Sequence, residues 1–354
     1  METFEEIIVQ KTTRSFIHQV DWNNLEFGKY NSDHMLVCDY AKGDWKTPHI
    51  VPFSNLSLSP TTLALHYGQT IFEGMKAFSM QDGKINIFRP FRHYERFVRS
   101  ADRMCMAVIP QDIFIDGLQR LIELDRKWVP SSPGSALYIR PFMIATEAKL
   151  GVKVSEEYRF IIVSTPVGPY YQKPLKVKIE TRYVRACRGG TGYAKCGGNY
   201  GAAFYPTQKA REEGFDQVLW TDGKDNKFIE ESGTMNAMFV INDRLITPPL
   251  SDSILDGITR DSFIRLAKDE GIWVEERQVS IDEIRNAFNK NTITEAFGVG
   301  TAAVASSIQT IGIDDEIYEM PVTNKPKIMD LLKSRLHDIR TGLSSDIHQW
   351  NYTV

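Results

Sequence analysis

Short segments of extended pattern, separated by turn residues, open the chain. Residues 35–53 predict two strands joined by a turn at Ala41 to Trp45. A second strand pair is expected around Asp82-Gly83, because an Asp-Gly pair favours the tight turn of a hairpin. The segments SALYIRPFMIAT and EYRFIIVSTPV also predict strands.

Between these strands, apolar residues recur every three or four positions. In RHYERFVRSADRMCMA they include Phe97 and Met104, and in DIFIDGLQRLIELDRKWV they include Leu118 and Leu121. This spacing predicts two amphipathic helices that cover one face of a sheet.

Strands and helices also alternate in the second half. KVKIETRYVRA predicts a strand, and Asn199 is well placed as the N-cap of a helix from Tyr200 to about Glu213, which Gly214 would end.

Hairpins follow this expected helix, one around Gly223 and one in AMFVINDRLITPP. A helix is then predicted in ITRDSFIRLAKDEG, stopped by Gly271, and Ser280 with Glu283 forms a capping box for another in SIDEIRNAF. The whole pattern predicts an α/β (α+β) chain.

The stretch VGPYYQKPLK separates the two halves, with Pro169 and Pro174 on either side of two tyrosines. Proline-rich segments of this kind are typical of linkers. We therefore expect a small N-terminal domain at 1–165, a linker at 166–178 and a larger C-terminal domain at 179–354. The length of 354 residues suits two domains.

Charge and cysteine content narrow the possible partners. The 42 basic and 45 acidic residues give a formal net charge of −3, so neither nucleic acid nor an anionic membrane is an expected partner, and small molecules become the default ligands. The four cysteines show no CxxC spacing, which favours a reduced compartment. The N-terminal segment reads neither as a signal sequence nor as a transit peptide, so we expect a cytoplasmic protein, and we predict no metal site.

One lysine lies in an unusually glycine-rich stretch, RGGTGYAKCGGNYGAAF. Glycine weakens helices and strands, so such a stretch indicates special backbone torsions or a close approach to the backbone. Lys195 with Gly192, Gly197 and Gly198 would leave space for an aldehyde to reach the amine. The alternative is an exposed lysine beside a turn. GGTGYAKC lacks the GxxxxGK[ST] spacing of a P-loop, which we exclude.

Three other features suit an anion or a ring nitrogen. In ILDGITR, a helix starts at Gly257 to Thr259 and offers backbone N–H groups to a phosphate, unless it is an ordinary cap. In FGVGTAAVASS, the amides of Thr301 and Ala302 could meet an anion, unless the small residues serve tight packing. Glu231, in FIEESGTMNAMF, could face a pyridine nitrogen or be solvated at a hairpin end. A lysine, a helix terminus and a carboxylate together are what pyridoxal phosphate requires.

Seven blocks in this order resemble the branched-chain amino-acid aminotransferases, which are pyridoxal-phosphate enzymes of fold type IV. The resemblance runs from about Asn31 to Gly342, and its blocks are LHYGQTIFEGMKAF, FRPFRHYERFVRSADRM, YIRPF, GGTGYAKCGGNYG, ESGTMN, DGITR and FGVGTAA. It implies transfer of an amino group between L-leucine, L-isoleucine or L-valine and 2-oxoglutarate, giving branched 2-oxo acids and L-glutamate (EC 2.6.1.42).

The resemblance also implies roles for the site residues. Lys195 would bind the cofactor covalently and move the proton between the substrate α carbon and the cofactor's C4′. Tyr200 would hydrogen-bond the phenolic oxygen and Glu231 the ring nitrogen. The remaining cofactor-binding residues implied, mostly around the phosphate, are Arg96, Thr234, Ile258, Thr259 and Thr301.

On the substrate side, the family pattern implies an apolar slot bounded by aromatic rings. Tyr67, Arg140 and the Thr301–Ala302 backbone would orient the carboxylate, and Arg140 could instead be a structural partner of a tyrosine. The residues carried over to this side are Tyr67, Phe72, Tyr138, Arg140, Tyr170, Thr301 and Ala302. A homodimer is implied as well.

One departure from the family pattern concerns thiols. Mammalian members have a CxxC pair after the GTA block, where this chain has Ala303 and Ser306, so we do not expect a redox switch.

Alternatives stay open at this point. A D-amino-acid aminotransferase or an aminodeoxychorismate lyase would share the fold, the lysine and the phosphate site, whereas EGMKAF and YIRPF favour the branched-chain reading. A catalytically silent ligand-binding relative is the alternative of another class. The order of preference among the three amino acids, the direction of the reaction in the cell and the role of Tyr170 and Tyr171 are also open.

Overall fold

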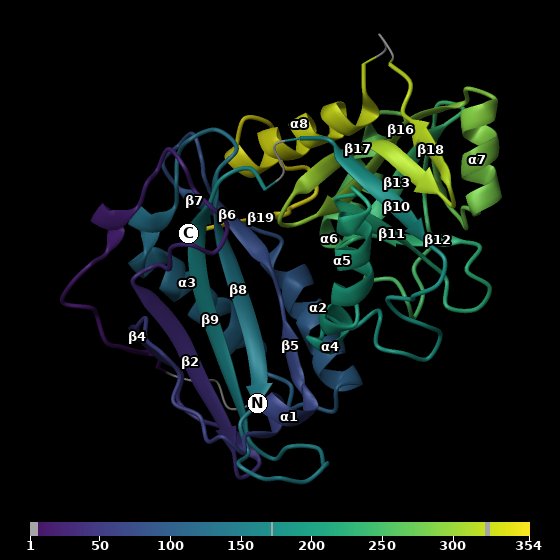
Figure 1. The fold of residues 1–354 in the computed structure, drawn as a ribbon. Coiled ribbons are helices and arrows are strands. Elements are labelled where there is room, and N and C mark those ends of the chain that lie inside the picture. Colours follow the sequence, from purple (N-terminus) through teal and green to yellow (C-terminus); the bar gives the residue numbers. More distant parts are fainter. Residues whose placement is uncertain (1–5, 171–172, 323–325) are drawn as a thin grey trace. The chain divides into compact units, whose positions relative to one another are not determined.

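The computed structural model describes residues 6–170, 173–322 and 326–354, which form two compact units (Figure 1). Unit 1 comprises residues up to Tyr170 together with Ala194–Gly198 and Ile339–Val354, and unit 2 comprises Tyr171–Tyr193 and Asn199–Asp338. Neither unit is continuous in sequence, in contrast to the expected domains at 1–165 and 179–354. Residues 171 and 172 of the expected linker lie outside the described residues.

Two short segments account for this difference. The C-terminal strand β19 (Asn351–Thr353) pairs with β7 (Ile85–Phe88), and Cys196 forms a bridge with Ile71. Backbone pairing therefore places both segments with unit 1, although they lie far along the chain.

Unit 1 contains a ten-stranded sheet in the order β1-β4-β2-β9-β8-β6-β7-β19, with β3 paired to β2 and β5 paired to β8. Its pairings are antiparallel except that between β1 and β4. The remaining strands are β1 (Ile8–Val9), β2 (His34–Ala41), β3 (Asp44–Trp45), β4 (His49–Pro52), β5 (Thr70–Phe72), β6 (Met75–Ser79), β8 (Ala136–Ala145) and β9 (Tyr158–Val167).

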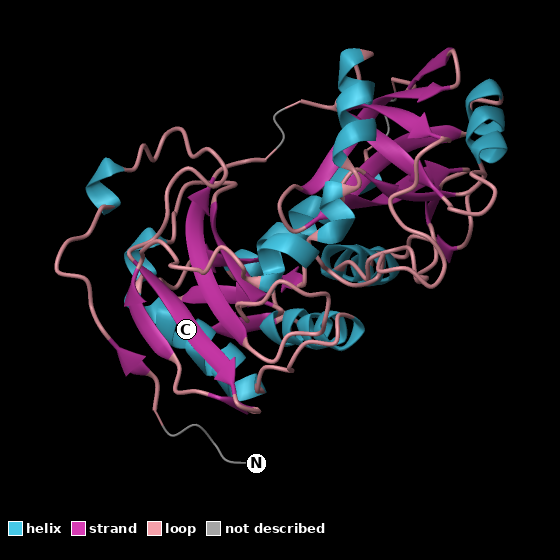
Figure 2. Cartoon of the chain, turned by 60° about the horizontal axis from the view of Figure 1, so that its bottom comes forward, coloured by secondary structure: helices cyan, strands magenta, loops and turns pink. Residues whose placement is uncertain are grey.

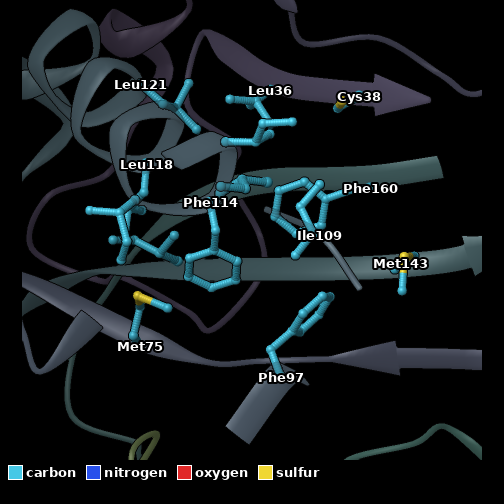
Figure 3. Close-up of a cluster of buried hydrophobic side chains, with 14 of the residues drawn as sticks. Leu36, Cys38, Met75, Phe97, Ile109, Phe114, Leu118, Leu121, Met143 and Phe160 are labelled. Atoms are coloured by element: carbon cyan, nitrogen blue, oxygen red, sulfur yellow. The ribbon is translucent and has the colours of Figure 1, made fainter. Parts of the chain in front are cut away.

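Helices α2 (Pro90–Arg103) and α3 (Gln111–Leu124) cover one face of this sheet, as their apolar spacing predicts (Figure 1). The hydrophobic core between these helices and the sheet includes Phe97, Phe114 and Phe160, whose rings contact one another with centroids 5.5–5.6 Å apart (Figure 3). The shorter helices of unit 1 are η1 (Ile17–Gln19), α1 (Leu63–Tyr67) and η2 (Arg126–Trp128).

Alternation along β8 separates the two faces of the sheet. Leu137, Ile139 and Met143 are fully buried in the helix-covered core. Because side chains alternate along a strand, Tyr138 and Arg140 point to the opposite face. The candidate residues of β8 therefore share the face that α2 and α3 leave uncovered.

Unit 2 is built around a nine-stranded sheet in the order β12-β11-β10-β17-β16-β13-β14-β15, with β18 paired to β17. A further pairing of β12 with β13 closes six of these strands into a ring. Its strands are β10 (Leu175–Glu180), β11 (Gln217–Thr221), β12 (Ile229–Ser232), β13 (Met235–Ile241), β14 (Arg244–Thr247), β15 (Val274–Glu276), β16 (Ile293–Gly300), β17 (Val304–Ile313) and β18 (Glu316–Glu319).

The helices of unit 2 lie outside its strands (Figure 2). They are α5 (Phe204–Glu212), α6 (Ile258–Asp269) and α7 (Ile281–Asn289). Two further helices, the short α4 (Gly198–Gly201) and the long α8 (Ile328–Thr341), contain residues that belong to unit 1 and residues that belong to unit 2. The capping box is confirmed, since Ser280 Oγ accepts the N–H of Glu283 over 3.0 Å. Among the described helices, none combines the length and the apolar character needed to cross a membrane.

The predicted helix from Tyr200 to Glu213 is wrong at its start. It is split into α4 and α5, and Asn199 lies within α4 instead of capping a helix. The Asn199 side chain bonds the glycine-rich stretch, donating to the Thr191 carbonyl over 2.8 Å and accepting from the Thr191 hydroxyl over 2.7 Å. A polar side chain used in this way is not available as a cap. The strand predicted over 176–186 likewise ends at Glu180.

Candidate active site

The glycine-rich stretch places Lys195 against strand β5. The Phe72 N–H donates to the Lys195 carbonyl oxygen over 3.0 Å, and the Gly197 N–H donates to the Thr70 carbonyl oxygen over 3.2 Å. A Cβ on Gly197 would lie 3.2 Å from the Thr70 methyl carbon, closer than most side-chain contacts. The small residue therefore permits the close approach of the two segments.

The Lys195 amine and the Arg140 guanidinium both contact the ring of Phe72. The Lys195 Nζ is 4.8 Å and the Arg140 Cζ is 4.7 Å from its centroid, distances at which a cation is attracted by an aromatic ring. Arg140 Nη2 also donates to the Tyr138 hydroxyl over 2.9 Å. A Cβ on Gly74 would lie 2.0 Å from that hydroxyl, so the position of Tyr138 requires glycine there.

Two more rings extend this cluster. Phe27 packs edge-on against Tyr138, with centroids 4.8 Å apart, and against Tyr170, with centroids 5.2 Å apart. Two buried polar atoms nearby, Arg140 Nε and Thr165 Oγ1, lack a hydrogen-bond partner among the described residues. Thr165 pairs with Tyr138 across β8 and β9, so both atoms belong to the face that carries the rings.

Tyr67 is separate from this cluster in the structure. It ends α1, is 43% exposed, and its ring lies 6.1 Å from that of His66. Within the described parts of the chain, no hydrogen bond or ring contact joins it to Phe72, Tyr138 or Arg140. Its expected substrate contact stays a prediction.

Arg96 is held by a buried carboxylate that the sequence analysis did not select. Arg96 Nε and Nη2 donate to the two oxygens of Glu73 over 2.6 and 2.8 Å, and His93 Nδ1 lies 2.7 Å from Glu73 Oε2. All three side chains are at least 96% buried. This paired geometry fixes the plane of the guanidinium.

Charges within this group balance. Burial opposes the charged form of Glu73, but Arg96 and His93 outweigh it and hold the pKa of Glu73 below its ordinary value. Burial lowers the pKa of His93 to about 4, so the imidazole is neutral near pH 7 and donates its Nδ1–H to Glu73. The cluster is therefore one carboxylate paired with one guanidinium.

In unit 2, Glu231 is buried at the end of β12 and is also held from several sides. Its Oε2 lies 3.1 Å from Arg185 Nε, and its Oε1 accepts the Leu255 N–H over 2.7 Å. Asn236 Nδ2 lies 3.5 Å from the same oxygen and donates to the Leu255 carbonyl over 2.9 Å. The alternative of a solvated carboxylate at a hairpin end is thus wrong.

A second carboxylate, Glu230, is buried beside Glu231. It accepts a hydrogen bond from the Ser253 hydroxyl, and its other oxygen has no partner among the described residues. Burial raises the pKa of Glu230 to about 7, while the Ser253 hydrogen bond and the Arg185 charge oppose the shift. This part of unit 2 therefore holds two carboxylates and one guanidinium.

The start of α6 lies next to Glu231. Gly257 is its N-cap residue, has extended backbone torsions and carries no side chain that could cap the helix. A Cβ on Gly257 would lie 1.8 Å from Asn236 Oδ1, which shows how closely the two segments pack. Ile258 and Thr259 follow, both buried.

The other candidate residues of unit 2 lie in turns or in α4. Thr301 and Ala302 form the turn between β16 and β17, two residues beyond Val299, which pairs with Asn236. Thr234 is exposed in the tight turn between β12 and β13, and Tyr200 lies in α4. Because Asn236 pairs with both Glu231 and Val299, the turn with Thr301 and Ala302 lies at the same end of the ring of strands as Glu231.

Four buried or partly buried residues were missed from the sequence: Glu73, Ser100, Arg185 and Glu230. Glu73 directly follows Phe72, and Ser100 is one helical turn after Arg96, so a search for partners around each selected residue would have found both. Arg185 is distant in sequence from Glu231, and no local spacing indicates that they pair.

These residues and this fold define a class of enzyme. The Amino-transferase class IV family model matches residues 70–311, most of the chain, so the chain belongs to the class IV aminotransferases. A curated relative, branched-chain-amino-acid aminotransferase 2 of Bacillus subtilis, is 44% identical over 339 residues, covering 94% of this chain and 93% of the relative. Within its class, the chain therefore falls among the branched-chain-amino-acid aminotransferases.

Solved structures share the fold. The branched-chain amino acid aminotransferase of Escherichia coli has a TM-score of 0.75 at 24% identity, covering 90% of this chain and 98% of the other. A branched-chain aminotransferase of Thermobaculum terrenum, solved in its PLP-form, has a TM-score of 0.73 at 22% identity and covers 91% and 98%. The fold type IV expectation is confirmed.

Proposed function

We propose that this enzyme uses pyridoxal 5′-phosphate to transfer the amino group between L-leucine, L-isoleucine or L-valine and 2-oxoglutarate. The observation that carries the proposal is the arrangement around Phe72, where the amine of Lys195 and the guanidinium of Arg140 contact the same ring. An apolar ring beside an amine and a guanidinium suits a substrate that has an apolar side chain and a carboxylate.

The residues present fit pyridoxal phosphate. Lys195 supplies a primary amine, Glu231 a buried carboxylate, and α6 a buried first turn that begins after a glycine N-cap. Lys195, Tyr200, Glu231 and Thr234 would hold the ring of the cofactor, and Arg96, Ile258, Thr259 and Thr301 its phosphate. The bound ring supplies an electron sink for the bond that breaks at the substrate α carbon.

The protein side chains then have distinct tasks. Lys195 Nζ would move the proton to and from the substrate α carbon. Glu231, which Arg185 and the Leu255 N–H hold in its charged form, would pair with the ring nitrogen. Tyr67, Arg140 and the Thr301–Ala302 backbone would orient the substrate carboxylate, and the rings of Phe72, Tyr138 and Tyr170 would bound the apolar slot.

Two further expectations belong to the same proposal. We propose a cytoplasmic homodimer, with Tyr67 contributing to substrate binding in the assembled enzyme. Its exposure in the single chain leaves its ring available for such a contact.

Amino-group transfer to 2-oxoglutarate tests the proposal directly. Loaded wild-type enzyme should produce glutamate with L-leucine, L-isoleucine and L-valine, and none above background with D-alanine. Arg140→Met should raise the KM for L-leucine about tenfold or more, because a charge-assisted contact is lost, whereas Arg159→Met, in a partly exposed ion pair with Asp39, should not. Turnover with D-alanine alone would move the function to the D-amino-acid branch, and binding without any turnover would favour a silent relative.

A further inference from the structure

A buried serine joins the helix that carries Arg96 to the backbone of Lys195. Ser100 lies in α2, one turn after Arg96, and is fully buried. Its hydroxyl donates to the Arg96 carbonyl oxygen over 2.9 Å, and its oxygen accepts the Lys195 N–H over 2.9 Å. A helical serine often donates to the carbonyl four residues earlier. Accepting the amide of a residue 95 positions later in the chain is an additional role.

These bonds close a circuit around Lys195. On its other side, the Lys195 carbonyl oxygen accepts the Phe72 N–H, and Phe72 is followed directly by Glu73. The Glu73 carboxylate holds the Arg96 guanidinium, and Arg96 leads back to Ser100. Both the N–H and the carbonyl of Lys195 are therefore bound to parts of unit 1 that also position Arg96.

The circuit matters because glycines lie on both sides of Lys195. The Cys196 bridge to Ile71 and the Gly197 bond to Thr70 hold the residues that follow Lys195, and the circuit holds the Lys195 backbone itself. Gly192, Gly197 and Gly198 have no side chains to pack, and glycine permits many backbone conformations. A lysine that must reach one reacting atom needs a fixed backbone, since a displacement of about 1 Å can slow a reaction about a hundredfold.

We propose that Ser100 is a positioning residue for amino-group transfer, whose hydroxyl fixes the Lys195 backbone at a set spacing from Arg96. Ser100 contacts neither substrate nor cofactor in this role. It acts through Lys195, so that the Lys195 amine and the Arg96 guanidinium, which is proposed to bind the phosphate, can contact the same cofactor molecule. The inference rests on the proposed function.

A matched pair of alanine variants tests this role. Ser164, in β9, is also buried in unit 1, and its hydroxyl bonds that of Ser32 over 2.7 Å, so Ser164→Ala removes a comparable hydrogen bond at another place. With pyridoxal phosphate bound, Ser100→Ala should slow the rapid-mixing half-reaction with L-leucine about tenfold to a hundredfold, with the KM for L-leucine changed by less than about threefold. Ser164→Ala should leave the rate within about twofold.

Two results would overturn the proposal. One is a Ser100→Ala half-reaction within about twofold of wild type, and the other is an equal slowing in both variants, which would reflect general loss of stability. The wild type tests the proposed function separately from the role of Ser100. If the wild type does not bind pyridoxal phosphate or does not react with L-leucine, the proposed function is rejected before any variant is compared.

A second measurement needs no variant, and therefore holds even if Ser100→Ala does not fold. Hydrogen exchange of the wild-type protein without cofactor should show a protected Lys195 amide, because that N–H is bonded inside the unit. Exchange of this amide as fast as that of an exposed loop would contradict the circuit.

Discussion

Each unit buries a cluster of charged side chains, and the two clusters compensate their carboxylates differently. In unit 1, Glu73 is matched by Arg96 and assisted by a neutral His93. In unit 2, Glu230 and Glu231 share Arg185, and burial raises the pKa of Glu230 to about 7. The first cluster keeps its charges across the neutral range, whereas the second exchanges a proton within it. Burial alone does not decide how a carboxylate behaves; the number of nearby cations does.

Removing the shared cation should have the largest effect on stability. Arg185→Met would remove the cation that Glu230 and Glu231 share, together with the bonds from Arg185 to the Gly192 and Ser253 carbonyls. We expect a loss of about 3–5 kcal/mol in the free energy of unfolding, measured by denaturant titration. Arg285→Met is the control, since Arg285 pairs with Asp282, Asp314 and Glu316 at the surface of unit 2 and should cost less than about 1 kcal/mol. Equal losses would contradict the account.

Loss of one charge from the Glu73–Arg96 cluster of unit 1 should reduce the free energy of unfolding slightly less. Glu73→Gln removes the carboxylate charge that faces Arg96 but retains one oxygen that can accept a hydrogen bond, so we expect a loss of about 2–4 kcal/mol in the free energy of unfolding. Asp39→Asn is a matched control, because Asp39 binds Arg159 through both oxygens, over 2.6 and 3.0 Å, but is partly exposed. A Glu73→Gln loss no larger than the Asp39→Asn loss would show that the buried pair contributes no more to stability than the partly exposed one.

The two neighbouring carboxylates of unit 2 should differ in chemistry. Glu231→Gln should still bind pyridoxal phosphate but slow α-proton abstraction about a hundredfold, because a neutral amide no longer holds the ring nitrogen protonated. Glu230→Gln should change that step less than about threefold, since Glu230, with its pKa raised to about 7, is already partly protonated near neutral pH. The measurement is the half-reaction of each variant with α-deuterated L-leucine. An unchanged rate in Glu231→Gln would remove its assigned role.

The smallest effect concerns pH. The folded-state pKa of Glu230 lies above its ordinary value of 4.5, so the folded protein binds an extra proton between 4.5 and about 7. Its contribution to stability is complete below 4.5 and is lost as the pH rises through 7. Between about pH 5 and about pH 8, the Tm of the wild type should therefore fall by a few degrees more than that of Glu230→Gln. Parallel Tm curves would show that Glu230 titrates normally.

Much of the fold was predictable from the sequence. The helical spacing of Phe97, Leu118 and Leu121 predicted α2 and α3, and the Ser280–Glu283 capping box predicted the start of α7. Such elements can be predicted from a short stretch of sequence, because residues close together in the chain determine where a helix forms and where it begins. Asn199 shows the limit: its local context favours a cap, but a contact with Thr191 uses its side chain elsewhere.

Motifs in the sequence select candidate site residues, but they do not show which side chains hold those residues in place. Lys195, Arg96 and Glu231 were selected from the sequence, and each is buried or partly buried in the structure. Their partners Ser100, Glu73 and Arg185 were not selected, because pairing between separate segments is a property of the folded chain. The buried charge of Glu230 depends likewise on tertiary packing.

Reductive trapping of the cofactor tests the central claim most directly. Wild-type protein loaded with pyridoxal phosphate is treated with borohydride, digested and analysed by mass spectrometry, with Lys195→Ala treated in parallel. We expect the pyridoxyl group on Lys195 of the wild type, and neither stable labelling nor amino-group transfer in Lys195→Ala, whose unfolding temperature should stay close to that of the wild type. Labelling of another lysine in the wild type, or transfer by Lys195→Ala above background, would contradict the assignment of Lys195.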